Sequence, residues 1–149
     1  MKERKIMPFD KNFVPALRFA VMSDIHIDDE DCIEEQRFAK ALDDLKNLCS
    51  SDERYSGFDA LVIVGDFASR GSEIQMRKVK KILDAGLPAD VRLIMTMASH
   101  EYMTDGEENA LRRFNEIFGL TPDTHAVING FDFIAVTTTR LSLIHISEP

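Results

Sequence analysis

Side chains that could bind divalent metal ions follow three short apolar runs in this chain. They are Asp24 and His26 after the run at 19–22, Asp66 after the run at 60–64, and His100 after the run at 93–97. Carboxylate oxygens and imidazole nitrogens are common ligands of divalent metals. Because the carboxyl ends of parallel strands form the ligand-binding edge of an open α/β sheet, we expect the four side chains to share one pocket. A lone aspartate or histidine would more often cap a strand end, but the cluster favours a metal site.

Alternating strands and helices must position these residues. Apolar runs predict strands over about 17–22, 60–64 and 91–97. Helical spacing of apolar residues predicts helices over about 38–49, from the capping box at 72–75 to Gly86, and over about 107–118. Two further runs, 125–128 and 131–136, flank an Asn-Gly turn and predict a hairpin. This order implies an α/β fold with a mostly parallel sheet and a C-terminal hairpin.

Three motifs carry a resemblance to a known family. They are Asp24-Ile25-His26, Gly65-Asp66 with Arg70 four residues after the aspartate, and Ala98-Ser99-His100-Glu101. In this order and after these strands, they resemble the motifs of the calcineurin-like metallophosphoesterase superfamily, over about residues 17–137. The third motif of that family normally reads Gly-Asn-His-Glu or Gly-Asn-His-Asp, so Ala98 and Ser99 depart from it. The resemblance implies a β-sandwich flanked by helices, here truncated, that hydrolyses phosphate esters with two metal ions.

The resemblance also implies a role for each motif residue. Asp66 would bridge two divalent ions, Asp24 and His26 would be ligands of the first ion, and Ser99 stands where an asparagine binds the second. Water activated by the metals would attack phosphorus in line, and His100 would give a proton to the leaving-group oxygen. Mn, Fe and Zn all suit such ligands. Since a serine hydroxyl is a shorter and weaker donor than an amide oxygen, the second metal site is doubtful.

Residues beside these motifs have both functional and structural interpretations. The guanidinium of Arg70 either grips a phosphate oxygen or belongs to an ordinary surface arginine. Glu101 either orients the preceding histidine or faces solvent. One residue separates Asp24 from His26, so an extended backbone would direct both side chains to the same face.

Other polar residues have simpler interpretations. The acidic run at 28–31 is expected to be solvated charge at the start of a helix, with an extra cation site as the alternative. His125 is expected to be an ordinary, partly exposed residue of a strand. Cys32 and Cys49 lie too far apart along the predicted helix to form a disulfide.

The composition limits the partners of the protein. A net charge of −8 argues against duplex nucleic acid as the main partner, which would favour a basic surface. No apolar stretch is long enough to span a membrane, and the start of the chain lacks the apolar core of a signal peptide. We therefore expect a cytoplasmic protein whose partner is a phosphate-ester substrate. The oligomeric state is left open.

The two ends of the chain are set apart from the predicted phosphoesterase portion at 16–140. Residues 1–15 are expected to form a loose leader. Residues 141–149, Leu-Ser-Leu-Ile-His-Ile-Ser-Glu-Pro, resemble an in-frame translation of a transposase adapter used in sequencing libraries. We therefore interpret them, including His145, as an artefactual tail. The alternative is a real strand, because the segment alternates in polarity. With the adapter interpretation, the later histidine motifs that complete the family's metal cage are missing.

The leading hypothesis is a metal-dependent hydrolase, either a phosphatase or a phosphodiesterase, whose activity in this fragment is weak or absent. The alternative is a non-catalytic binding or scaffold relative that has lost the second metal site through Ser99. A third hypothesis is a truncated chain that does not fold stably, because an uncovered sheet face would promote aggregation. The substrate itself is not indicated by the sequence.

Overall fold

A parallel sheet of three strands lies at the centre of the computed structural model, which describes residues 12–51, 53 and 57–137. The strands are β1 (Phe19–Met22), β2 (Ala60–Val64) and β3 (Arg92–Thr96), in the order β1-β2-β3. Met22 pairs with Ile63, and Val64 pairs with Thr96, so the carboxyl ends of all three strands lie at one edge. Most of the predicted leader and the whole predicted tail, with its His145, lie outside the described residues.

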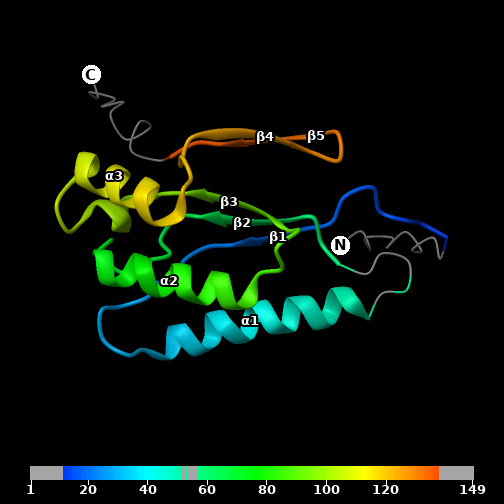
Figure 1. Ribbon diagram of the computed structural model, residues 1–149, viewed down its shortest axis with the longest axis horizontal. Coiled ribbons are helices and arrows are strands. Elements are labelled where there is room, and N and C mark those ends of the chain that lie inside the picture. The colour runs from blue at the N-terminus through cyan, green and yellow to red at the C-terminus, as the bar shows by residue number, and fades with distance from the viewer. Residues whose placement is uncertain (1–11, 52, 54–56, 138–149) are drawn as a thin grey trace, which may run out of the picture.

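Helices cover one face of this sheet, and a hairpin lies over part of the other (Figure 1), where Phe19 and Val21 stay about half exposed (49% and 56%). Figure 1 shows α1 (Ile33–Ser50) and α2 (Glu73–Gly86) below the sheet, while β4 (Thr124–Ile128) and β5 (Phe131–Ala135) lie above it. The remaining helix, α3 (Glu107–Phe118), follows β3. The hairpin contacts the sheet through Phe19 and Phe133, whose ring centroids lie 5.3 Å apart. The predicted α/β class, with a parallel sheet and an antiparallel C-terminal hairpin, is confirmed.

Local signals set the ends of the helices. At the start of α2, the Ser72 hydroxyl accepts a hydrogen bond from the Gln75 N–H at 3.2 Å, and the Gln75 side chain accepts one from the Ser72 N–H at 3.3 Å. This reciprocal pair is the predicted capping box. Gly119 ends α3 with a left-handed φ of 66°, as a glycine at that position allows.

The core lies between the sheet and the helices. Its fully buried members come from β2, α2 and α3, and from the segments that follow β1, β2 and β3. Three rings form what we call the aromatic cluster: Phe67, Phe114 and Phe118, with centroid separations of 5.1 to 6.1 Å. Phe67 directly follows the candidate ligand Asp66, so the core reaches the carboxyl edge of the sheet.

Some element boundaries differ from the predicted ones. β1 begins at Phe19 rather than near residue 17, and α1 begins at Ile33, earlier than its apolar pattern predicts. The acidic residues 28–31 are exposed, as expected, but they make no side-chain cap for α1. They contact α2 instead: Asp29 accepts a hydrogen bond from the Gln75 side chain at 3.2 Å, and Lys78 donates to the Glu30 carbonyl at 2.8 Å.

The remaining polar residues of interest have structural roles. His125 is exposed, and its Nε2 lies 2.6 Å from Asp132 Oδ1 across the hairpin. Cys32 and Cys49 are both free. Among the described helices, none is long and apolar enough to cross a membrane.

Candidate metal centre

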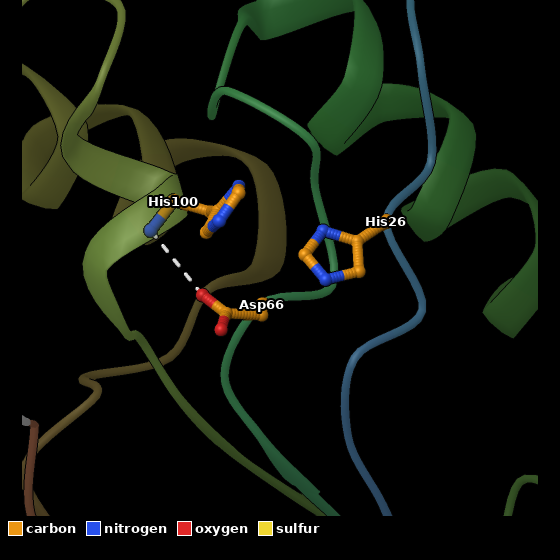
Figure 2. A group of neighbouring side chains, drawn as sticks. All are labelled: His26, Asp66 and His100. Atoms are coloured by element: carbon orange, nitrogen blue, oxygen red, sulfur yellow. Dashed lines mark hydrogen bonds between the residues drawn. The ribbon is translucent and has the colours of Figure 1, made fainter.

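His26, Asp66 and His100 each bring one potential ligand atom into a common group. These atoms all lie within 4.8 Å of one another. Figure 2 shows the three side chains converging from three separate segments of the chain. The two imidazoles are in edge-to-face contact, with ring centroids 4.7 Å apart. Three of the four side chains predicted to share a pocket are therefore brought together.

The register of the sheet explains this convergence. After β1 and β2, the two chain segments continue side by side: the His26 N–H donates to the Asp66 carbonyl at 3.0 Å, and the Ile27 N–H donates to the Phe67 carbonyl at 3.0 Å. His100 enters from η1 (Ser99–Tyr102), the short 3₁₀ helix that follows β3. All three donors thus lie at the carboxyl ends of neighbouring parallel strands, where ligands of open α/β sheets bind.

The backbone at these donors is left-handed rather than extended. The φ angles are 54° at Asp24, 52° at His26 and 49° at Asp66. Our prediction that Asp24 and His26 alternate along an extended backbone was therefore wrong, because β1 ends at Met22 and the chain then turns over the end of β2. Residues other than glycine adopt this region rarely, at a cost of about 1–3 kcal/mol each, and such residues cluster at functional sites.

Asp24 lies beside the group without being part of it. Its Oδ1 is 3.9 Å from His26 Nε2, and its Oδ2 accepts a hydrogen bond from the Ser23 hydroxyl at 2.5 Å. The side chain is exposed. Asp24 is thus close enough to add negative charge to the site.

His100 is held in one orientation by the loop after β2. Its Nδ1 lies 2.8 Å from the Ser69 carbonyl, which can only accept a hydrogen bond, so Nδ1 carries a hydrogen. In the neutral ring, Nε2 then has the free lone pair. The backbone N–H of His100 also donates to Asp66 Oδ1 at 3.2 Å, as the dashed line in Figure 2 marks. These two hydrogen bonds therefore orient the His100 ring and the Asp66 carboxylate.

Glu101 is fully buried, which sequence analysis missed. Its carboxylate accepts hydrogen bonds from the backbone N–H groups of Asp66 at 3.0 Å, Ala68 at 3.0 Å and Ala98 at 2.8 Å. Burial raises the pKa of the Glu101 carboxyl; the three N–H groups oppose this rise, and the negative charge of Asp66 adds to it. The alternative that Glu101 faces solvent was wrong, and its carboxylate bonds to these backbone N–H groups.

Ala98 contributes by its close approach to Gly65. Ala98 has a φ of −123°, so this position does not need the left-handed freedom of glycine. Gly65 does need it, since its φ is 76°. A Cβ at Gly65 would lie 2.4 Å from the Ala98 Cβ and 2.9 Å from the Ala98 nitrogen. The loops after β2 and β3 therefore pack closely at Gly65 and Ala98, and a glycine at position 65 makes this close packing possible.

The other two predicted site residues lie at the surface of these loops. Arg70 is exposed, its N–H donates to the Gln75 side chain at 2.9 Å, and its carbonyl accepts from the Thr104 N–H at 3.0 Å. Ser99 is exposed at the start of η1, next to His100. Contact of Arg70 with a phosphate and of Ser99 with a metal both stay predictions.

The donor types in this group fit a divalent transition metal. Two imidazoles and one carboxylate are a ligand set found around Zn, Fe and Mn. The bond between His100 and a backbone carbonyl is the outer interaction that usually orients a metal-binding histidine. A cation would also offset the repulsion between the carboxylates of Asp66 and Glu101.

The sequence of this chain was compared with those of known protein families and of curated proteins. The sequence model described as calcineurin-like phosphoesterase matches residues 17–147, which include every donor discussed above. This range runs past Arg140, so it overlaps the segment predicted to be an artefactual tail, and the origin of that segment stays a prediction. A search among curated proteins gave no match.

Proposed function

The chain belongs to the calcineurin-like phosphoesterase family, and from this premise we propose that its site serves the metal-dependent hydrolysis of phosphate esters. A bound divalent ion would supply positive charge for the phosphoryl oxygens and lower the pKa of water. His26 and Asp66 would hold that ion, with Asp24 beside them. The observation that carries the proposal is the convergence of the donor atoms at the carboxyl edge of the sheet.

Within this proposal, His100 moves a proton. Its Nδ1 hydrogen is engaged by the Ser69 carbonyl, so Nε2 is the atom that can exchange a proton with a leaving-group oxygen. Histidine suits this task because imidazole gains and loses a proton near neutral pH. Arg70, exposed on the adjoining loop, would contact a phosphate oxygen of the substrate.

Asp66→Asn is expected to weaken Mn²⁺ binding by about 100-fold, because a neutral amide replaces the central carboxylate of the group. Calorimetric titration of the folded protein measures this change. Asp132→Asn is the matched control, since Asp132 is an exposed aspartate of the hairpin and should leave Mn²⁺ affinity unchanged. Retention of wild-type Mn²⁺ affinity in Asp66→Asn would contradict the proposed site.

Turnover by this 149-residue chain is proposed to be low, because His100 is used for proton transfer in this proposal and the remaining grouped donors, His26 and Asp66, would hold one ion rather than two. Hydrolysis of 4-nitrophenyl phosphate with Mn²⁺ tests the point. Rapid turnover that disappears in Asp66→Asn would support the proposed chemistry but show that the site is more complete than we propose.

A non-catalytic binding relative is the second candidate function, and the serine at position 99 is the observation that favours it. Ser99→Asn is expected to raise the metal content from about one to about two ions per chain, because an amide oxygen would add a neutral donor beside His100. Elemental analysis after removal of free Mn²⁺ measures the ratio. An unchanged ratio would mean that Ser99 is not what limits the second site.

A further inference from the structure

We infer that Glu101 is a positioning residue, which sets the relative placement of Asp66 and His100 by tying the loop after β2 to the turn after β3. The inference rests on the proposed function only in taking Asp66 and His100 as the site. Glu101 itself is fully buried and belongs to no group of potential metal ligands among the described residues. Its role would be exerted through backbone, not through contact with substrate.

The hydrogen bonds of the Glu101 carboxylate join the two loops. Oε2 accepts from the Ala98 N–H on its own loop at 2.8 Å and from the Asp66 N–H on the other loop at 3.0 Å. Oε1 accepts from the Ala68 N–H, also on the other loop, at 3.0 Å. The backbone N–H of Asp66, the central ligand, is therefore hydrogen-bonded directly to the Glu101 side chain.

Further contacts keep the same two loops together on either side of Glu101. His100 bonds to the Asp66 carboxylate and to the Ser69 carbonyl. The N–H and hydroxyl of Thr104 both donate to the Arg70 carbonyl, at 3.0 and 2.7 Å. These contacts align the loops near the surface, whereas Glu101 joins them through a fully buried carboxylate.

A carboxylate is the chemical group that this space requires. The donors that meet it are backbone N–H groups from three residues, so the side chain must accept on both oxygens and donate on neither. Glutamine could keep the two bonds made by Oε2, but its amide nitrogen would then face the Ala68 N–H, donor against donor. Two like-charged carboxylates, Glu101 and Asp66, also make the region favourable for a cation.

The inference predicts that replacing Glu101 weakens metal binding even under conditions where the variant stays folded. In Glu101→Gln, Co²⁺ affinity is expected to fall about 10- to 100-fold, the usual effect of disturbing groups that orient metal ligands. The visible absorption spectrum of bound Co²⁺ is expected to shift, since it reports the geometry of the ligands. Both are measured in one titration of the full chain, at a temperature where thermal unfolding shows the variant to be folded.

Gln75→Met is the matched control. Gln75 is also fully buried, and its side-chain oxygen accepts from the Arg70 and Ser72 N–H groups at the far end of the same loop. The Gln75→Met variant should have a lower unfolding temperature, because it loses buried hydrogen bonds away from the ligands. Its Co²⁺ affinity should stay within about twofold of the wild type, and the spectrum of bound Co²⁺ should be unchanged. If Glu101→Gln behaves like this control, the inference is overturned.

Two further results separate this inference from the proposed function. If Glu101→Gln does not fold, Glu101→Asp keeps the charge but shortens the reach between the loops, and wild-type Co²⁺ affinity in that variant would overturn the inference. If the wild-type chain binds no Co²⁺, the proposed metal site fails. Hydrogen exchange then decides the role of Glu101 alone: the amides of Asp66, Ala68 and Ala98 should be protected in the wild type and exchange faster in the variant, and equal exchange would refute it.

Discussion

Replacing Gly71 by alanine is expected to lower the free energy of unfolding by about 3 kcal/mol and to abolish metal binding. Gly71 has a φ of 72°, where an alanine is strained by about 1–2 kcal/mol. A Cβ at this position would also lie 1.9 Å from the Glu101 carbonyl oxygen and 2.5 Å from its carbonyl carbon. Since these are backbone atoms, the turn after β3 must move, and overpacking of this kind adds about 1–3 kcal/mol.

Gly119→Ala isolates the part of this effect that comes from crowding. Gly119 has a similar φ of 66°, but a Cβ there would meet nothing within 4 Å. It should therefore cost only the conformational strain, about 1 kcal/mol, and leave Mn²⁺ binding intact. Urea unfolding of both variants gives the comparison. Equal losses in the two variants would show that the close approach between Gly71 and Glu101 does not matter.

Phe67→Ala is expected to destabilise the protein by about 3–5 kcal/mol, the usual cost of removing a buried phenylalanine ring. Phe67 is fully buried, and its ring centroid lies 5.7 Å from that of Phe118 and 6.1 Å from that of Phe114. The cavity would open under Asp66, so the loop that carries the central ligand would lose its support. Urea unfolding measures the change.

Phe131→Ala is the corresponding control on the surface. Phe131 lies at the start of β5 and is 47% exposed, so its removal should change the free energy of unfolding by less than about 1 kcal/mol. A similar loss in both variants would mean that the aromatic cluster contributes no more than an exposed ring. Phe67→Leu, which refills most of the volume, should fall between the two.

Much of the fold could be predicted because local sequence and tertiary structure agree. The limits of β2 and α3, the capping box of Ser72 and the Asn129-Gly130 turn all follow from short-range patterns that the structure keeps. The grouping of His26, Asp66 and His100 was also predictable, because parallel strands of equal register must end at one edge.

The details of the site depend on contacts that no local pattern reports. Glu101 lies on a turn of only four residues, too short for periodicity to show which side chains point inward. The left-handed backbone at Asp24, His26 and Asp66 is imposed by hydrogen bonds between loops distant in sequence. The sequence places a carboxylate directly after His100, but its burial follows from backbone N–H groups of two separate loops that converge on it. No local pattern reports that convergence.

The parallel register has a consequence for how a cation and folding are coupled. The three donors lie on segments that follow three separate strands, so the unfolded polypeptide holds no preformed chelate and a metal ion would act as a selective ligand of the native state. At a concentration one hundred times its dissociation constant, such an ion adds about 2.7 kcal/mol to stability by mass action. A chelator would remove this stabilisation, so the melting temperature reports how much of the protein has the metal ion bound.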